Sequence, residues 1–277
     1  MKAVRSPQRS ASKSETRSKP AGYSDRPFAA NLADSPDFGF PSRGLVASAF
    51  STNAWSITMI TVIEGVDRDR HPALIEAMFR MRAAVFAERL EWDVSVTNGL
   101  EIDRFDAEDP LYLISVDERT AALQGAVRLL PTTGPNMLRD VFPALVPGGA
   151  PESPLIWESS RFAINPEAFE TADRGRANHA VNRITVELLC GIVEVCHRAG
   201  IEHVVSVFDA RMARIFRSID CAFEIIGTPT RIGKTMTYAG VFDMSDEMRE
   251  RLGRAGQLHH PVLAAGTSLR PVDAPPV

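Results

Sequence analysis

From residue 59 onward, short apolar segments rich in β-branched residues alternate with longer segments whose apolar residues recur every three to four positions. The first pattern is typical of strands and the second of amphipathic helices. The predicted strands cover 59–65, 111–117, 123–131, 155–164, 202–209, 223–227 and 235–243, and the predicted helices cover 71–89, 138–145, 177–199 and 210–219. Because some strands are joined by short turns and others by helices, the pattern predicts a mixed α/β fold.

The two ends of the chain lack this alternation. Residues 1–58 begin with a segment rich in Ser, Arg, Lys and Pro, which predicts a disordered extension, or an upstream start codon taken in place of Met59. Residues 259–277 are rich in proline and are predicted to form a loose tail. The predicted folded domain is therefore 59–258.

Composition and spacing argue against several functional classes. The net charge is −4, whereas nucleic-acid-binding domains are usually basic. No apolar run approaches the ~20 residues that span a bilayer, so no membrane partner is predicted. The three cysteines lack C-x-x-C spacing, which predicts reduced, buried thiols in a cytoplasmic protein. The six histidines show no metal-ligand spacing, so no metal site is predicted.

The segment G-T-P-T-R-I-G-K-T (227–235) is similar to a phosphate-binding loop, but its spacing is wrong. That loop has four residues between its glycines, whereas five residues separate Gly227 from Gly233. A predicted strand also follows where a helix N-terminus would be needed. The sequence therefore does not support a nucleoside triphosphatase activity.

Charged residues interrupt the apolar pattern in three predicted elements. They are Arg82 in the helix 71–89, Arg128 in the strand 123–131, and Glu158 with Arg161 in the strand 155–164. A buried guanidinium without a carboxylate partner is unfavourable, although a single one can extend to solvent. Several together indicate a polar site within the core.

Regular alternation along 155–164 places Glu158, Ser160 and Phe162 on one face of the strand. Ser159 and Arg161 then share the other face. A β-bulge would change this arrangement and could bring both charged side chains to one cleft.

The segment that follows the helix 71–89 offers partners for the arginines. Its acidic residues are Glu101, Asp103 and Asp106, within G-L-E-I-D-R-F-D (99–106). A solvated acidic loop is the alternative. Phe86 and Trp92 come shortly before this segment, and aromatic rings beside carboxylates can hold a cation. Either ring alone would most often belong to a core.

Four segments, in this order and at these distances, resemble the acyl-homoserine-lactone synthases, the LuxI-type autoinducer synthases of bacterial quorum sensing. They are M-R-A-A-V-F-A-E-R-L-E-W-D-V (81–94), G-L-E-I-D-R-F-D (99–106), V-R-L (127–129) and E-S-S-R-F (158–162). The resemblance covers 59–245. It implies a fold related to the N-acetyltransferases, a twisted mixed sheet flanked by helices. Two splayed central strands, here 155–164 and 202–209, leave a V-shaped gap in such a sheet.

The resemblance also implies an activity. Family members are acyltransferases that move an acyl chain from acyl carrier protein, or in some members from CoA, to the amine of S-adenosylmethionine. The methionine carboxylate then closes a lactone and expels methylthioadenosine. S-adenosylmethionine is therefore a substrate, and no separate cofactor is implied.

Site residues are implied in the same way. Glu158 would be the base that takes the proton of the amine, and Arg161 would hold the site together or bind the substrate carboxylate. Phe86 and Trp92 would be walls of the S-adenosylmethionine pocket, facing its sulfonium. The remaining implied substrate-binding residues are Arg82, Asp103, Asp106 and Arg128, which would form an ion-pair lattice, and Ser160, Phe162 and Ser206.

This chain departs from the family pattern in its predicted acyl pocket. Ser206 stands where the family often has a threonine that contacts a 3-oxo acyl group, and serine keeps the hydroxyl. Ile219, Asp220 and Cys221 stand where the family often has glycine and an aromatic residue.

Two alternative functions stay open. An N-acetyltransferase that uses acetyl-CoA would need a glycine-rich loop after 155–164, where D-R-G-R-A-N-H-A (173–180) has one glycine. A non-catalytic module could bind S-adenosylmethionine or acyl carrier protein, but the presence of Glu158 disfavours it.

Overall fold

The computed structural model describes residues 58–165, 174–264, 267 and 269, without the side chains of 58 and 174–180. The predicted extension up to 57, most of the predicted tail and the side chains of nearly all of D-R-G-R-A-N-H-A lie outside this description. By its internal contacts the chain divides into Met1–Thr52 and Asn53–Val277. The fold described below is that of the second unit.

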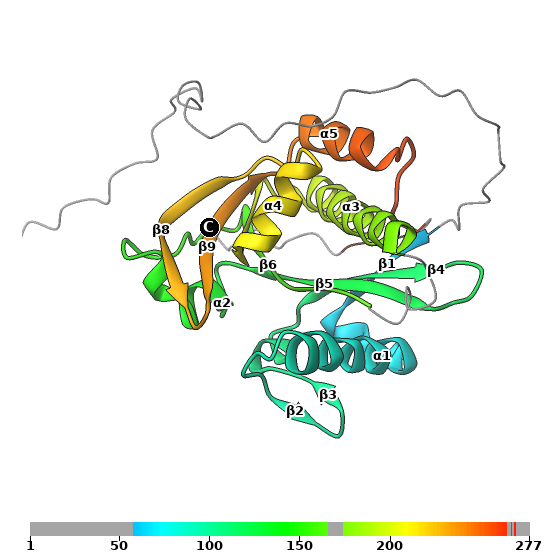
Figure 1. Ribbon diagram of the computed structural model, residues 1–277, viewed down its shortest axis with the longest axis horizontal. Coiled ribbons are helices and arrows are strands. Elements are labelled where there is room, and N and C mark those ends of the chain that lie inside the picture. Colours follow the sequence, from blue (N-terminus) through cyan, green and yellow to red (C-terminus); the bar gives the residue numbers. More distant parts are fainter. Residues whose placement is uncertain (1–57, 166–173, 265–266, 268, 270–277) are drawn as a thin grey trace, which may run out of the picture. The chain divides into compact units, whose positions relative to one another are not determined.

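A mixed seven-stranded sheet organises the described residues (Figure 1). Its strand order is β1-β4-β5-β6-β7-β9-β8, with β6 and β7 parallel and the other neighbours antiparallel. Its strands are β1 (Thr58–Glu64), β4 (Leu111–Asp117), β5 (Leu123–Pro131), β6 (Ile156–Ile164), β7 (His203–Asp209), β8 (Glu224–Ile232) and β9 (Thr235–Asp243). A separate hairpin consists of β2 (Val96–Thr97) and β3 (Leu100–Glu101). The predicted α/β class is confirmed.

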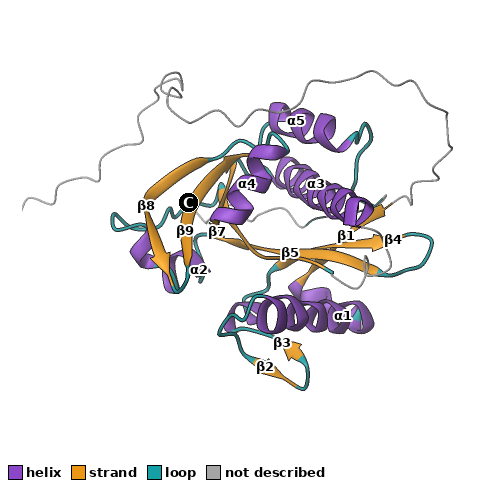
Figure 2. Ribbon diagram, viewed as in Figure 1, coloured by secondary structure: helices purple, strands orange, loops and turns teal. Residues whose placement is uncertain are grey.

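Helices cover both faces of the sheet (Figure 2). They are α1 (Pro72–Arg82), continued by a π-helix (Ala83–Arg89), α2 (Met137–Asp140), α3 (Arg174–Ala199), α4 (Ala210–Ser218) and α5 (Asp246–Gly256). Short 3₁₀ helices cover Gly65–Arg70, Arg104–Ala107 and Pro143–Leu145. Helices α3, α4 and α5 lie on one side of the sheet and α1 lies on the other (Figure 1).

Two large apolar clusters join these layers. On the α3 side, Ile60, Leu113 and Leu129 of the sheet pack with α3 residues such as Leu188 and Ile192. On the α1 side, the helix uses two parallel stripes of apolar residues. Met78, Met81 and Val85 come from one stripe and Ile75, Phe79 and Phe86 from the other, and all pack against β4, β5 and β6. This burial on both faces holds the central strands in place.

Strands β6 and β7 separate partway along their length. They pair from Ile156 with His203 to Ser159 with Ser206, and no pairing continues beyond that point. Residues on both strands past this point are only half-buried, Ser160 to Phe162 on β6 and Val207 on β7, although the strands are central. The predicted V-shaped gap between two splayed central strands is therefore confirmed.

A β-bulge in β6 decides which side chains reach the gap from the α1 side. Ala126 pairs with Ala163 and Arg128 with Ser160, so Arg161 and Phe162 together oppose Val127. Arg161 has a φ of 54°, which is unfavourable for a residue with a side chain and is found mainly where function needs it. The bulge turns Arg161 to the α1 side, where Glu101 accepts its hydrogen bonds.

The regular alternation predicted for 155–164 is therefore wrong after Ser160. Phe162 packs against the α3-side cluster, opposite to Glu158 and Ser160. The bulge, which was the alternative, is the arrangement that the structure has.

Within the predicted loose tail, the residues from Val262 to Ala264 are docked on the folded domain. The Ile60 amide donates to the Val262 carbonyl at 2.9 Å, and the Ala264 amide donates to the Ile60 carbonyl at 3.0 Å. The Glu194 carboxylate accepts from the amides of Val262 and Leu263. Because Val262 and Leu263 bury their side chains against the core, the proline-rich composition does not leave this part loose.

Candidate active site

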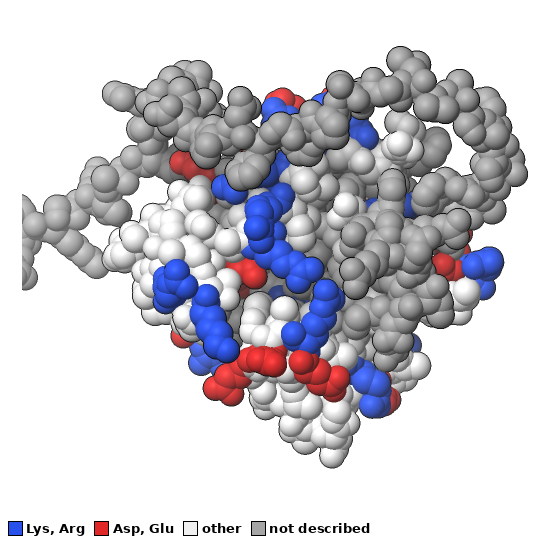
Figure 3. Space-filling view, viewed as in Figure 1, with Lys and Arg blue, Asp and Glu red and all other residues white. Residues whose placement is uncertain are grey.

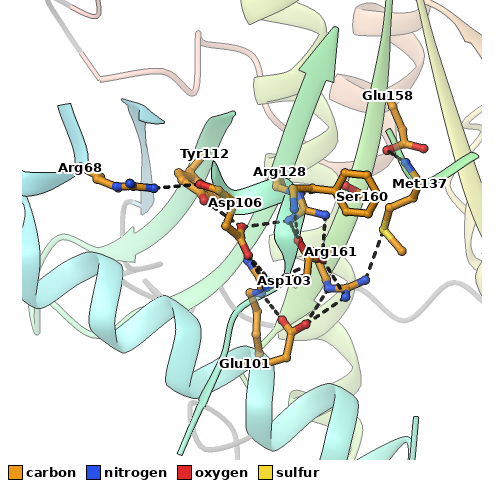
Figure 4. A network of polar contacts seen from close by, with 12 residues as sticks. Arg68, Glu101, Asp103, Asp106, Tyr112, Arg128, Met137, Glu158, Ser160 and Arg161 are labelled. Carbon is orange, nitrogen blue, oxygen red and sulfur yellow. Dashed lines mark hydrogen bonds and ion pairs between the residues drawn. The ribbon is translucent and has the colours of Figure 1, made fainter. Parts of the chain in front are cut away.

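Three arginines and three carboxylates form one buried network on the α1 side of the sheet (Figure 4). Arg82 comes from α1, Arg128 from β5 and Arg161 from β6. Glu101 comes from β3, and Asp103 and Asp106 from the 3₁₀ turn Arg104–Ala107 and its N-cap. Three positive and three negative charges balance, which is the condition for keeping so many ionised groups out of water.

Arg82 is held on both edges of its guanidinium. Its Nη1 and Nη2 donate to the two oxygens of Asp106 at 2.8 and 2.9 Å, and its Nε donates to Glu101 at 2.5 Å. Burial by itself would lower the pKa of Arg82, but the hydrogen bonds and charges of Asp106 and Glu101 raise it overall. The side chain is 1% exposed, so the alternative that it extends to solvent is wrong.

Arg128 joins the second side of the network. Its Nη1 and Nη2 donate to the two oxygens of Asp103 at 2.5 and 3.0 Å, and Nη1 also donates to Asp106 at 2.9 Å. Its Nε donates to the Ser160 hydroxyl at 3.2 Å. Arg128 thereby connects the network to β6 at the edge of the gap.

Asp106 is the centre of the network. Besides both arginines, the Tyr112 hydroxyl donates to it at 2.8 Å and the Asp103 amide at 2.9 Å. Burial alone would raise the pKa of Asp106, but the hydrogen bonds and charges of Arg82 and the charge of Arg128 outweigh it and lower that pKa. The pKa of Tyr112 is raised, first by burial and then by the adjacent charge of Asp106.

Local sequence explains why the segment 99–106 presents three carboxylates in one direction. Asn98 and Gly99 both have positive φ and form the tight turn between β2 and β3. Asp103 caps the 3₁₀ turn, because its side chain accepts a hydrogen bond from the Phe105 amide. The Asp106 carboxylate in turn accepts from the Asp103 amide, which completes a capping box. The alternative of a solvated acidic loop is wrong, because Glu101 and Asp106 are buried.

The aromatic pair lies next to Arg161. The rings of Phe86 and Trp92 stack with centroids 5.3 Å apart, and the Arg161 guanidinium lies 5.4 Å from the Phe86 centroid. Phe86 belongs to the π-helix, whose wider turn is a feature frequently found at functional sites. Trp92 is 48% exposed while Phe86 is 3% exposed, so Trp92 offers the accessible ring.

Glu158 stands apart from the ion pairs (Figure 4). It is fully buried on β6, and its carboxylate accepts from the amides of Met137 and Leu138 at 2.9 and 2.6 Å. Burial raises the pKa of Glu158, although these two amides and Arg128 act in the opposite direction. Met137 also connects it to the network, because Arg161 donates to the Met137 sulfur at 3.3 Å. A raised carboxyl pKa is what a general base near neutral pH requires.

The remaining predicted residues lie around the gap but on different faces. Ser160 lies on the network side, as its contact with Arg128 shows. Ser206 lies where β6 and β7 part, and its hydroxyl donates to the Ser159 carbonyl at 2.8 Å. Phe162 lies on the α3 side and so has no part in the network.

Glu101 and Tyr112 complete the network; Glu101 was predicted as a partner for the arginines but not as a site residue, and Tyr112 was not predicted at all. Glu101 is fully buried and joins Arg82 to Arg161. Its position between Leu100 and Ile102, an acidic residue in an apolar pair, was the available signal. Tyr112 lies in a strand of apolar residues, where nothing local distinguishes a tyrosine with a hydrogen-bonded hydroxyl from one that only fills the core.

Together these residues provide a buried ion-pair network, an accessible aromatic ring and a separate buried carboxylate, beside the point where β6 and β7 part. Such a site can hold a small charged substrate and accept a proton from it. Among the described residues, no group of three or more His, Cys, Asp or Glu side chains could hold a metal ion. In the same part of the chain no helix is long and apolar enough to cross a membrane.

Comparison with known proteins supports this interpretation. Residues 66–252 match the family described as autoinducer synthase. The acyl-homoserine-lactone synthase of Agrobacterium fabrum is 36% identical over 62% of this chain and 80% of its own length. The isovaleryl-homoserine lactone synthase of Bradyrhizobium diazoefficiens is 30% identical over 70% of this chain and 86% of its own length.

Solved structures agree. A CoA-dependent acyl-homoserine lactone synthase, BjaI, solved with SAM and isopentyl-CoA, has a TM-score of 0.66 at 27% identity over 76% of this chain and 95% of that chain. The synthase LasI has a TM-score of 0.61 at 29% identity over 71% of this chain and 95% of that chain. The chain therefore belongs to the autoinducer synthase family, the acyl-homoserine-lactone synthases.

Proposed function

We propose that this synthase transfers an acyl chain from acyl carrier protein to the amine of S-adenosylmethionine and then closes the lactone, releasing methylthioadenosine. The observation that carries the proposal is the buried carboxylate of Glu158 beside the gap, next to an ion-pair network with an accessible aromatic ring. The gap admits the thioester, and the network side holds the S-adenosylmethionine.

In the first step the α-amine attacks the thioester carbonyl. An α-amine with a pKa of about 7.7–8.0 is mostly protonated at neutral pH, so a base must take its proton before the C–N bond forms. Glu158 is that base, directly or through one water. The carbon–sulfur bond then breaks, and the carrier thiolate leaves and takes up a proton.

In the second step the methionine carboxylate attacks its own γ-carbon and the carbon–sulfonium bond breaks. Methylthioadenosine leaves as a neutral thioether, so the step needs no further proton transfer. Its main requirement is orientation, because the reacting atoms belong to one molecule. The network is suited to this role, since Arg128, Arg161 and their partners are fixed by several hydrogen bonds each.

A basic surface on α4 supports acyl carrier protein as the donor. Arg211, Arg214 and Arg217 are exposed, and α4 directly follows β7, one side of the gap. Figure 3 shows Lys and Arg side chains gathered in this region. An acidic carrier domain would be attracted to such a surface. CoA is the second candidate donor, because the related BjaI is CoA-dependent.

The direct experiment incubates the full chain with S-adenosylmethionine and a panel of acyl carrier protein and acyl-CoA thioesters. Mass spectrometry then detects methylthioadenosine and acyl-homoserine lactones together. Formation of both products supports the proposal and identifies the acyl chain. Thioester consumption without methylthioadenosine would indicate an ordinary acyltransferase, and binding of S-adenosylmethionine without turnover would indicate a binding module.

Charge reversal on α4 separates the two donors. Changing Arg211, Arg214 and Arg217 to Glu should raise the KM for acyl carrier protein thioesters about tenfold or more, and added salt should raise the wild-type KM in the same direction. Turnover of acyl-CoA should change much less. Arg119→Glu, an exposed change in the turn between β4 and β5, is the control. Equal losses with both donors would contradict a carrier-protein surface on α4.

Trp92 provides a test of the S-adenosylmethionine pocket. Trp92→Ala should weaken S-adenosylmethionine binding by roughly tenfold, because a cation–aromatic contact of about 1–2 kcal/mol is lost. Titration calorimetry measures this directly, and Trp92→Phe should keep most of the affinity. Stability should fall by only about 1 kcal/mol, since Trp92 loses its stacking on Phe86 but is already 48% exposed. Unchanged affinity in Trp92→Ala would place the sulfonium elsewhere.

A further inference from the structure

Trp157 contains a buried hydrogen-bond donor that has no partner among the described residues. Its indole Nε1 is inaccessible to solvent and makes no hydrogen bond to any residue that the structure describes. Buried indole N–H groups usually have an acceptor, and a buried polar group without one is unfavourable. The indole N–H has no role in the two steps of the proposed reaction.

The side chain lies at the closed end of the gap, on the α3 side. Trp157 pairs with Val204 on β7, two residues before the last pair of Ser159 and Ser206. It packs against the α3-side cluster, as does Phe162 in the bulge. The residue as a whole is only half-buried although β6 is a central strand.

One polar side chain at this end of the gap has already used its proton. The Ser206 hydroxyl donates to the Ser159 carbonyl at 2.8 Å, which leaves it only lone pairs to offer a ligand. Trp157 is the opposite case, because an indole N–H donates and cannot accept. The neighbouring β7 residues on this face, Val204 and Phe208, are apolar and buried.

We propose that the Trp157 indole donates a hydrogen bond to an oxygen on the acyl chain close to the thioester, as in a 3-oxo- or 3-hydroxyacyl donor. The inference rests on the proposed function, which puts the thioester in the gap and leaves the α3 side for the chain. An unsubstituted chain leaves the buried N–H without a partner. The buried indole N–H of Trp157 therefore discriminates against acyl chains that lack the oxygen. Trp157, rather than Ser206, then makes the contact that the family resemblance assigned to the Ser206 position.

The test compares thioesters of one chain length that are unsubstituted, 3-hydroxylated or 3-oxidised. In the wild-type chain the kcat/KM for at least one oxygen-bearing donor should exceed that for the unsubstituted donor by about tenfold or more. Trp157→Phe keeps an aromatic ring and removes the N–H, so this ratio should fall to within about twofold of one. For the 3-oxo donor, which cannot donate to the lone pairs of Ser206, Ser206→Ala should leave the ratio within about threefold of wild type.

Two further readouts separate a specific contact from a structural role. The melting temperature of Trp157→Phe without substrate should equal or exceed that of wild type, because the variant removes an unpaired buried group. In a ¹⁵N-labelled chain, the indole proton signal that Trp157→Phe eliminates should move downfield with a 3-oxoacyl-homoserine lactone, and less with the unsubstituted lactone.

Several results would overturn the inference. A folded Trp157→Phe that keeps the wild-type ratio would do so, as would loss of the ratio in Ser206→Ala alone. Wild-type preference for unsubstituted chains would overturn it while leaving the proposed function intact. Absence of turnover with every donor would instead refute the proposed function, and this inference with it.

Discussion

Replacing Glu158 with Gln should reduce formation of both methylthioadenosine and acyl-homoserine lactone by about 10²–10⁴-fold, the usual contribution of a positioned general base. Both products should fall together, because lactone closure follows acylation of the amine. The change keeps the size of the side chain, which is fully buried. Single-turnover assays with mass spectrometry measure the effect.

The controls for Glu158→Gln concern binding and folding. The carboxylate accepts from two amides, and a glutamine presents one oxygen and one NH₂ group to them, so some loss of stability is expected. Calorimetric titration with S-adenosylmethionine should nevertheless give an affinity close to wild type, because Glu158 lies outside the ion-pair network. Product formation within about threefold of wild type in a folded variant would exclude Glu158 as the base.

The pH dependence gives Glu158 a second test. Burial raises the pKa of Glu158, so the folded protein binds its proton more tightly than the unfolded chain does. Its contribution to stability is therefore lost as the pH rises from the ordinary glutamate range through the raised pKa. Urea titrations across this window should show this slope in wild type and its absence in Glu158→Gln. Identical slopes would show that Glu158 does not titrate there.

Replacing Arg82 with Leu should destabilise the protein by about 3–5 kcal/mol, because it leaves buried carboxylates without their partner. For a folded unit of this size the melting temperature should fall by roughly 6–20 °C. Arg82 is 1% exposed and holds both Asp106 and Glu101, so water cannot replace it. The loss of stability in Arg82→Lys should be intermediate, since lysine keeps the positive charge but lacks the planar guanidinium that bonds two carboxylates. Thermal denaturation distinguishes these outcomes.

A matched control lies two residues earlier on the same helix. Arg80 pairs with Glu76, and both side chains are 59% exposed. Arg80→Leu removes the same charge from the same helix and should change stability by no more than about 0.5 kcal/mol. Equal melting temperatures for the two variants would contradict the structural role of the network.

Acid should weaken the same network. The pKa of Asp106 is lowered in the folded state, chiefly by the hydrogen bonds and charge of Arg82 and by the charge of Arg128 against the effect of burial. Its contribution to stability is present above the ordinary aspartate pKa and is lost as the pH falls toward the lowered one. Asp106→Asn should flatten this part of the stability curve. A wild-type slope in that variant would assign acid sensitivity to other groups.

Much of the fold could be predicted because its signals are local. Strands 111–117 and 123–131 coincide with β4 and β5, since alternation and turn residues act over a few positions. The helix 71–89 coincides with α1 and its π-helical continuation for the same reason. Helix α5 was not predicted, although Ser245 caps it and Met248 and Leu252 are its buried residues. Its apolar stripe is short, so the sequence signal for this helix is weak until the core that it covers is known.

The sequence by itself indicated four charged residues that lie in or beside the buried network. A charged residue stands where the local pattern predicts an apolar one at four positions, Arg82, Arg128, Glu158 and Arg161. Such a conflict can be recognised from the sequence alone. Their order along the chain also indicated the family, because four short segments at fixed distances are specific in combination.

Only the tertiary structure decided how those residues meet. Arg161 and its partner Glu101 are 60 residues apart, and no local rule pairs one arginine with one of three carboxylates. The bulge that turns Arg161 toward the network depends on the register between β5 and β6. The burial of the Trp157 indole, without a partner in the described part of the chain, and the docking of Val262 and Leu263 depend equally on distant neighbours. Periodicity reports which side of an element is buried, whereas pairing and orientation follow from contacts that form only when the whole sheet has assembled.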